Sequence, residues 1–380
     1  MTYTSSWMNA ELEGFRDAVR RFIQAEILPH QDKWKHQQHV DREIWNKAGE
    51  MGMLLADIAE EYGGSGGTFA HECVVFEELS TLGDTCFGLH VHAIVAHYIL
   101  NQGTEAQKKK YLPQLASGAM IAAIAMTEPG AGSDLQGVRT SALLDGDEYI
   151  VNGSKTFISN GFMADLVLLV AKTDPAKGAK GTSLMLVETA NLAGYRRGRI
   201  LEKLGQKGQD TCELFFDNVR LPAESILGGI PGAGFVQLMT ELPYERAIVA
   251  VAGVAAIERA LALTVEHTRE RMVFGKPLID MQNTRFVLAE IKTEATVARI
   301  FIDHCIEQLI AGNLDTVRAS MAKYWITDLQ CSVVDRCLQL FGGYGYMLEY
   351  PITQMYADAR VQRIYGGANE IMKEIIARAL

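Results

Sequence analysis

The sequence YIVNGSKTFI at residues 149–158 interrupts a chain that otherwise has helical periodicity. The β-type runs Tyr149–Val151 and Thr156–Ile158 flank Asn152-Gly153-Ser154, a pattern typical of a hairpin turn. Other short β-type runs lie between turn residues on the C-terminal side: Leu166–Ala171, Ser183–Glu188, Cys212–Phe216 and, after Asp217-Asn218, Val219–Leu221. Frequent turns between short strands predict an antiparallel sandwich or barrel over residues 119–228.

Helical patterns flank this β region on both sides. Apolar residues recur every three or four positions over four N-terminal stretches: Phe15–Ile27, Glu43–Ile58, Phe69–Gln102 and Glu105–Leu115. Three longer amphipathic stretches follow the β region and predict an antiparallel bundle: Phe235–Arg271, Gln282–Ala311 and Leu314–Leu340. We therefore predict an α+β fold with a helical domain at 1–118, an antiparallel β domain at 119–228 and a four-helix-bundle-like domain at 229–380.

Composition limits the class of protein. The 380 residues are 48% hydrophobic and 22% charged, which is typical of a globular chain and excludes a disordered one. The formal charge of −10 gives no global positive field to attract nucleic acid or an anionic membrane. No uncharged apolar run approaches the ~20 residues of a membrane span, and the first residues lack a signal-peptide pattern. The six cysteines have no C-x-x-C spacing, which favours free thiols and a cytoplasmic location.

Two glycine-rich stretches could approach a ligand. The loop TEPGAGSD at 127–134 follows the apolar run Met120–Met126, and its exposed amides could cradle an anion or the polar edge of a ring. An ordinary turn explains the same residues. The stretch Gly342-Gly343-Tyr344-Gly345 follows a helix, which is the wrong context for a Rossmann fingerprint. It is either a helix C-cap or a close approach to a phosphate.

Other candidate sites have weak local signals. His90 and His97 could share a helix face, but His92 could not, and no carboxylate has ligand spacing nearby, so we predict no metal site. No G-x-S-x-G elbow is present. The pair Glu245-Arg246 opens the longest predicted helix, and by itself such a pair is usually a solvated surface ion pair.

Taken together, five motifs resemble those of the acyl-CoA dehydrogenases over nearly the whole chain. They are TEPGAGSD at 127–134, KTFISNG at 155–161, RMVFGKPLIDMQ at 271–282, QLFGGYGY at 339–346 and RIYGGANEI at 363–371. The resemblance implies a homotetramer with non-covalent FAD. It also implies that an acyl-CoA is oxidised to the trans-2-enoyl-CoA, as in fatty acid β-oxidation, and that electrons pass to electron-transferring flavoprotein.

The resemblance assigns cofactor contacts residue by residue. The matching positions are Met126, Thr127, Gly132 and Ser133 in the first loop, Phe157, Ile158 and Ser159 beside the flavin ring, Arg271, Phe274 and Gln282 reaching the FAD of a neighbouring subunit, Gln339 and Gly343 at its pyrophosphate and adenosine end, and Ala368 and Glu370 near the C-terminus. Ser133 also matches a contact with the substrate. Ala368 replaces the family's usual Thr and so lacks a hydroxyl for FAD.

The position of the base distinguishes subclasses of the family. Medium- and short-chain members place the catalytic Glu directly after the Tyr of the C-terminal motif, whereas Gly366 follows Tyr365 here. Long-chain and isovaleryl-type members place it before the Arg of the long helix, which corresponds to Glu245. The resemblance therefore implies Glu245 as the base and the Gly366 N–H as a donor to the thioester oxygen, with substrate contacts at Tyr244, Arg246 and Gly367. The substrate is then a long-chain or branched acyl-CoA.

Two alternatives remain open. A relative with the same fold could act on acyl groups bound to a carrier protein, or could use oxygen as an acyl-CoA oxidase. A helical scaffold without catalysis is the remote alternative, and a purified protein with no flavin colour would reveal it.

Overall fold

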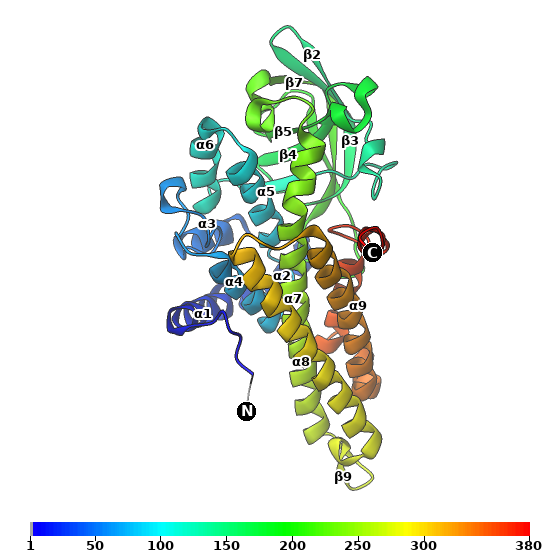
Figure 1. Ribbon diagram of the computed structural model, residues 1–380. Coiled ribbons are helices and arrows are strands. Elements are labelled where there is room, and N and C mark those ends of the chain that lie inside the picture. Colours follow the sequence, from blue (N-terminus) through cyan, green and yellow to red (C-terminus); the bar gives the residue numbers. More distant parts are fainter. Residues whose placement is uncertain (1–2) are drawn as a thin grey trace.

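The computed structural model describes residues 3–380; residues 1 and 2 of the predicted N-terminal domain lie outside the described part. The chain passes from helices through a sheet and back to helices, as predicted (Figure 1). The N-terminal helices are α1 (Ala10–Phe22), α2 (Gln31–Gln37), α3 (Arg42–Glu50), α4 (Phe69–Leu82), α5 (Leu89–Gln102) and α6 (Glu105–Ala116). The predicted helix over Phe15–Ile27 starts earlier, at the cap Asn9, and continues beyond Phe22 as a π-turn.

The single helix predicted over Phe69–Gln102 is wrong, because the chain turns between α4 and α5. Gly83 ends α4 in the left-handed conformation at φ +81°. The Asp84 carboxylate then accepts the backbone N–H groups of Cys86 (3.2 Å) and Phe87 (3.1 Å), which fixes the corner. The helix predicted over Glu43–Ile58 is also too long, since α3 ends at Glu50.

The sheet has seven strands: β1 (Ala122–Ala125), β2 (Ser141–Asp145), β3 (Glu148–Ser159), β4 (Leu166–Lys172), β5 (Thr182–Glu188), β6 (Tyr195–Ile200) and β7 (Thr211–Pro222). Their order is β1-β4-β2-β3-β7-β6, with β5 also paired to β4. The long pairings of β3 with β2 and β7, of β4 with β5 and of β6 with β7 are antiparallel, as predicted. The pairing of β1 with β4 is parallel, which the sequence pattern did not indicate.

The hairpin predicted at Asn152-Gly153-Ser154 is wrong, because these residues lie inside the single strand β3. They lie opposite a bulge in β7, where Asp217 and Asn218 face the single residue Asn152 and the register shifts between Val151 and Gly153. Gly153 has φ +152°, and a Cβ there would come within 2.5 Å of the Thr140 hydroxyl oxygen. The actual hairpin turn lies between β2 and β3 at Gly146, with φ +68°. Glycine therefore lies opposite a bulge at one position and within a turn at the other.

The C-terminal helices are α7 (Gly234–Glu270), α8 (Gln282–Ile310), α9 (Thr316–Phe341), α10 (Pro351–Ala359) and α11 (Asn369–Ala377). A small hairpin, β8 (Met272–Val273) and β9 (Lys276–Pro277), joins α7 to α8 at the far end of the bundle (Figure 1). In the described part of the chain, α7 alone is long and apolar enough to cross a membrane, with mean hydropathy 2.0. It packs against α4, α5, α8 and α9, so its apolar composition suits a central helix.

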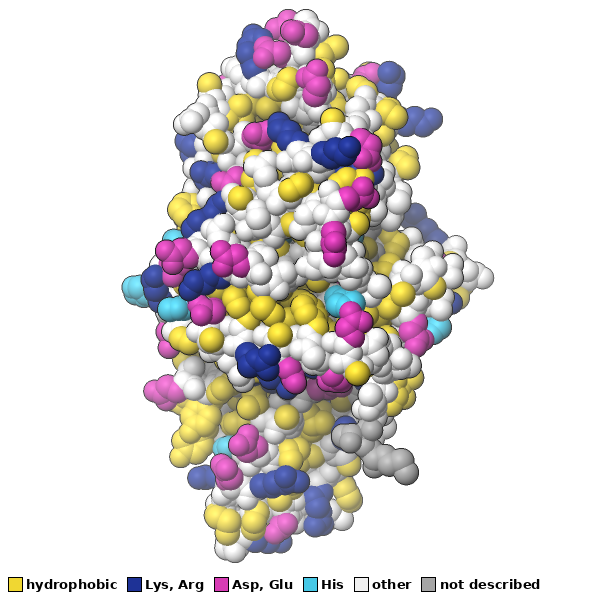
Figure 2. Space-filling view, turned by 90° about the vertical axis from the view of Figure 1, so that its left-hand side faces the viewer, with side chains coloured by type: hydrophobic (Ala, Val, Ile, Leu, Met, Phe, Trp, Pro, Cys, Tyr) yellow, Lys and Arg dark blue, Asp and Glu magenta, His cyan; other side chains and the backbone are white. Residues whose placement is uncertain are grey.

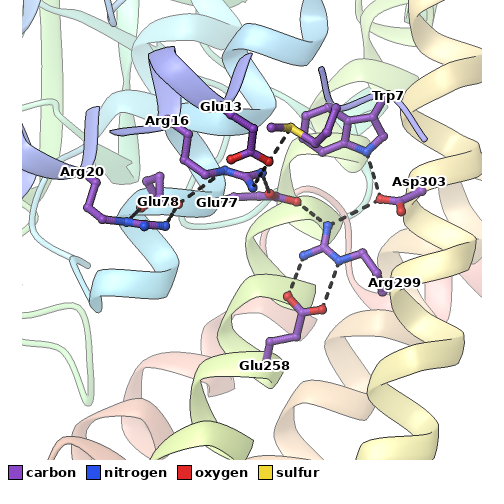
Figure 3. A network of polar contacts seen from close by, with 10 residues as sticks. Trp7, Glu13, Arg16, Arg20, Glu77, Glu78, Glu258, Arg299 and Asp303 are labelled. Carbon is purple, nitrogen blue, oxygen red and sulfur yellow. Dashed lines mark hydrogen bonds and ion pairs between the residues drawn. The ribbon is translucent and has the colours of Figure 1, made fainter. Parts of the chain in front are cut away.

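A buried ion-pair network joins the N-terminal helices to the bundle (Figure 3). The Arg299 guanidinium on α8 pairs with Glu77 of α4 and Glu258 of α7. Asp303, one turn further along α8, accepts the Trp7 indole N–H at 2.9 Å. The sharing of one guanidinium by three helices fixes their relative positions. On the surface, the face formed by the N-terminal helices carries acidic and basic side chains interspersed (Figure 2).

Candidate active site

Glu245 lies on α7 with its carboxylate enclosed by the protein. The residue is 6% exposed, and the Tyr98 hydroxyl of α5 donates to Oε1 at 2.7 Å. Burial raises the pKa of Glu245 to about 7, although the Tyr98 hydrogen bond and the Arg246 charge oppose the rise. A carboxylate in this environment can take a proton near neutral pH. Tyr98 has no motif of its own, so sequence reasoning missed it.

The two neighbours of Glu245 have different surroundings. The Arg246 guanidinium is buried and donates to the Ser320 hydroxyl at 3.0 Å, and no carboxylate in residues 3–380 forms an ion pair with it. The Tyr244 hydroxyl donates to Glu72 of α4, 2.9 Å from both carboxylate oxygens. Tyr244 is thereby directed toward the N-terminal helices rather than toward Glu245. Its predicted substrate contact therefore stays a prediction, with the hydroxyl already used by Glu72.

A histidine next to this tyrosine belongs to a compact acidic cluster. His97 stacks on the Tyr244 ring, and ligand atoms of Asp57, Glu72 and His97 lie within 4.8 Å of one another. The two His97 nitrogens contact the Ala93 carbonyl (2.9 Å) and Asp57 (3.0 Å). Burial opposes protonation, but Asp57 and Glu72 outweigh it and raise the pKa of His97 to about 10. A protonated imidazole donates from both nitrogens, which matches the two acceptors found here.

The turn at Gly366 and Gly367 lies beside the same face of α7. A Cβ on Gly366 would be 3.9 Å from Val249 Cγ2, and Val249 is one helical turn after Glu245. Both glycines have positive φ, +62° and +91°. The buried ammonium of Lys323 donates to the Gly367 carbonyl at 2.6 Å and to Asn369 Oδ1 at 2.9 Å. Lys323 therefore holds this backbone in place, a role that no sequence motif indicated.

The loop 127–134 is held from within and leaves its tip free. The Glu128 carboxylate accepts the backbone N–H groups of Arg139 (2.7 Å) and Thr140 (2.9 Å) and the Lys155 ammonium (2.9 Å). Lys155 also donates to the Met126 carbonyl at 2.9 Å. At the tip, Gly132 and Ser133 are exposed. Rigid support below an exposed tip is suited to presenting backbone amides to a ligand.

Phe157 is held in an unfavourable conformation next to this loop. Its φ is +59° and it is 67% exposed, while Thr156 and Ile158 beside it are buried. Thr156 N–H donates to the Thr127 carbonyl at 2.9 Å, so Phe157 lies close to the loop. An exposed aromatic ring in a strained backbone often marks a ligand contact. An apolar ring beside exposed backbone N–H groups fits a flavin, which has an apolar face and a polar edge. Ser159 follows on the same strand and is half-buried.

The remaining predicted cofactor residues lie elsewhere in the chain. The Arg271 guanidinium is 5.6 Å from the centre of the Tyr344 ring, next to Gly343 and near the end of α9, where Gln339 is exposed. Phe274 is 98% exposed at the β8–β9 turn, and Gln282 opens α8. Arg271 lies 26 residues beyond Glu245 along α7, about 39 Å at 1.5 Å per residue. Within one chain, the residues around Arg271 therefore lie far from Glu245. Ala368 and Glu370, at the start of α11, instead directly follow the Gly366–Gly367 turn.

Models of all three domains of one family match the chain. The N-terminal domain of acyl-CoA dehydrogenase matches residues 9–119, the middle domain 123–219 and the C-terminal domain 232–380. This chain belongs to the acyl-CoA dehydrogenase family. The resemblance inferred from the five motifs is thereby confirmed, as are the fold class and the assignment as an enzyme.

Relatives of this acyl-CoA dehydrogenase match over nearly their whole length. The long-chain specific acyl-CoA dehydrogenase of Mus musculus mitochondria is 48% identical over 375 residues, which are 98% of this chain and 87% of the relative. The crystal structure of an acyl-CoA dehydrogenase from Geobacillus kaustophilus superposes with a TM-score of 0.96 at 45% identity, covering 99% of each chain.

Other solved structures show cofactors and chemistries within this fold. A Mycobacterium smegmatis glutaryl-CoA dehydrogenase in complex with FADH2 has a TM-score of 0.91 at 28% identity, covering 98% of this chain and 95% of that one. A chain in the structure of the electron-transferring flavoprotein of Acidaminococcus fermentans has a TM-score of 0.93 at 33% sequence identity. The match covers 100% of this chain and 99% of that one. A prolyl acyl carrier protein oxidase has a TM-score of 0.92 at 28% sequence identity, and the match covers 98% of this chain and 99% of that one. Family membership and the fit at Phe157 support a flavin cofactor in this enzyme.

Proposed function

We propose that this enzyme removes two hydrogens across Cα–Cβ of a long-chain or branched acyl-CoA and forms the trans-2-enoyl-CoA. The observation that carries the proposal is the position of Glu245, a buried carboxylate on the face of α7 that the Gly366 backbone also lines. The family supplies the reaction type, and 48% identity to a long-chain enzyme supports the substrate class.

The residues of this chain have distinct tasks in that reaction. Glu245 accepts the α-proton, and its enclosed position excludes the water that would weaken a carboxylate base. The Gly366 N–H donates to the thioester oxygen, on which negative charge grows as the α-proton leaves. The Arg246 cation lies beside Glu245 and favours the charged form of the carboxylate. The flavin, when bound, accepts the hydride from Cβ.

We propose that the flavin is FAD, held by Met126, Thr127, Gly132 and Ser133 with Phe157, Ile158 and Ser159 at its ring. Gly367 and Glu370 would lie near it, and Ala368 offers no hydroxyl. The distance between Glu245 and the group at Arg271, Phe274, Gln282, Gln339 and Gly343 favours an oligomer in which this group serves a second chain's FAD. A homotetramer satisfies this arrangement.

Electron-transferring flavoprotein is the proposed acceptor, supported by the similarity to a chain in that protein's structure. The six free cysteines support a reducing compartment such as the cytoplasm. Fatty acid β-oxidation is the process that such a reaction serves. A carrier-protein thioester, or oxygen as the acceptor, is the second candidate, which the similarity to a carrier-protein oxidase favours.

The test is anaerobic bleaching of the bound flavin by straight and branched saturated acyl-CoAs. Glu245→Gln should retain flavin and bind acyl-CoA but reduce the flavin several orders of magnitude more slowly. Glu266→Gln, an exposed position on the same helix, is the control and should behave as the unmodified enzyme. Near-normal flavin reduction in Glu245→Gln would refute the assignment of the base. Peroxide formation under air would favour the oxidase.

A further inference from the structure

One stripe along the middle of α7 keeps a small exposed fraction. Glu245, Val249 and Ala252 are 6%, 8% and 8% exposed, and Ala256 is half-buried. Several residues on the other faces, such as Ile248 and Val251, are fully buried. The spacing of four, three and four residues places the stripe on one side of the helix. The stripe spans about 16 Å from Glu245 to Ala256 at 1.5 Å per residue.

The stripe ends at a cleft of about 500 Å³ between α7, the α4–α5 corner, α9 and α10. We call it the distal cleft, and its lining includes Thr85, Ala256, Arg259, Gln330 and Gln362. Its volume is that of a small-molecule site rather than of a packing defect. A chain that begins at Glu245 must be long to reach it.

Several polar groups in the distal cleft have no partner within residues 3–380. The side-chain oxygens of Gln330 (3% exposed) and Gln362 (8% exposed) accept no hydrogen bond. Both face Gly253 of α7, where a Cβ would lie 3.4 Å and 3.7 Å from them. The Arg259 Nε is also buried without a partner. Buried polar groups normally have partners, so these groups are suited to a ligand that both donates and accepts hydrogen bonds.

The charges around the distal cleft disfavour an anionic ligand. The lining carries four carboxylates, Asp32, Asp84, Glu349 and Asp358, against the two cations Lys35 and Arg259. A carboxylate would add to this excess and would face the two glutamine oxygens as one more acceptor. A neutral hydroxyl can donate to a glutamine oxygen and accept from the Arg259 Nε. The free groups therefore match a hydroxyl.

Resting on the proposed dehydrogenation at Glu245, we propose that the distal cleft binds a hydroxyl group on the far part of a long acyl chain. The site would then select hydroxylated long-chain acyl-CoAs over plain ones of equal length. The alkyl segment would follow the stripe at Val249 and Ala252, where small side chains leave space. The α4–α5 corner completes the wall that encloses the hydroxyl end.

The test compares a saturated long-chain acyl-CoA with its ω-hydroxy counterpart on the flavin-loaded enzyme. The measurement is kcat/KM for flavin reduction, reported as the ratio of the hydroxylated to the plain substrate. We expect a ratio of at least about ten, because the plain chain leaves the buried groups unpaired. Gln330→Leu and Gln362→Leu should each lower the ratio several-fold. Gln24→Leu, at an exposed position in the N-terminal helices, is the control and should leave the ratio of the two substrates unchanged.

The outcomes separate this inference from the proposed function. A ratio at or below one, or a ratio that neither variant changes, would overturn the hydroxyl site while leaving the dehydrogenation intact. Preference for an ω-carboxy substrate would overturn the choice of a neutral group. If neither substrate bleaches the flavin, the proposed function itself fails. Flavin absorbance and thermal melting confirm that each variant is folded, and the second glutamine variant tests the site if the first does not fold.

Discussion

At Glu245, the proposed base, burial both excludes water and raises the pKa of the carboxyl group. Because its pKa is raised to about 7, the carboxyl group is protonated and inactive below that pH and becomes a base as the pH rises. We therefore expect the rate of flavin reduction at saturating acyl-CoA to increase through about pH 7 and then level off. Stopped-flow measurements from pH 5.5 to 9 would show this rise. A rate that is flat across the range would contradict the assignment.

Tyr98 is the residue that restrains the pKa of Glu245. Its hydroxyl hydrogen bond stabilises the charged carboxylate, so Tyr98→Phe should raise the pKa of Glu245 further and move the pH–rate profile to higher pH. For each unit by which the pKa of Glu245 rises, the rate of flavin reduction measured well below the new pKa should fall roughly tenfold. Tyr111→Phe, which removes a hydrogen bond to Glu188 elsewhere, is the control. A structural defect alone would lower the rate without moving the profile.

At the scale of elements, the α4–α5 corner depends on Gly83. The residue has φ +81°, and a Cβ would come within 2.6 Å of the Arg259 guanidinium. Gly83→Ala should therefore lower the free energy of unfolding by about 1–3 kcal/mol, from backbone strain together with displacement of Arg259. Gly312→Ala is the matched control, since Gly312 has φ +70° and open space around it. If urea unfolding gives the same loss in the free energy of unfolding for both variants, the steric clash with Arg259 does not contribute.

The helices that the sequence predicted best are those with sustained periodicity. The starts and ends of α7, α8 and α9 lie within two residues of the predicted ranges. The corner at Gly83 was missed because helical periodicity continues on both sides of it, although Gly83, Asp84 and Gly88 are residues that favour a turn. The Asn152-Gly153 pair was mistaken for a hairpin turn because such a pair favours a turn, and only the pairing with β7 shows that it lies inside a strand.

At the scale of the whole molecule, the network around Arg299 couples the N-terminal helices to the bundle (Figure 3). Arg299→Met would remove one of the two guanidinium partners of the buried Glu77, leaving Arg16. It would also remove the cation that pairs with the buried Asp303, so we expect a loss of about 3–5 kcal/mol in the free energy of unfolding. Adding Glu77→Gln should recover part of this loss, because it removes one of the two buried carboxylates, Glu77 and Asp303, that paired with Arg299. Denaturant unfolding of the single and double variants measures both effects. A double variant less stable than Arg299→Met would contradict this account.

The amino-acid sequence by itself determined the order of helices, sheet and helices and the family, and it led to Glu245 as the proposed base. These features depend on local periodicity and on motifs that are contiguous in the chain. Only the tertiary structure decided that Tyr98, 147 residues away, holds Glu245, that Lys323 fastens the Gly367 turn, and that Gln330 and Gln362 meet in one cleft. Such contacts depend on how distant helices pack, and nothing in a residue's local neighbourhood encodes its partner.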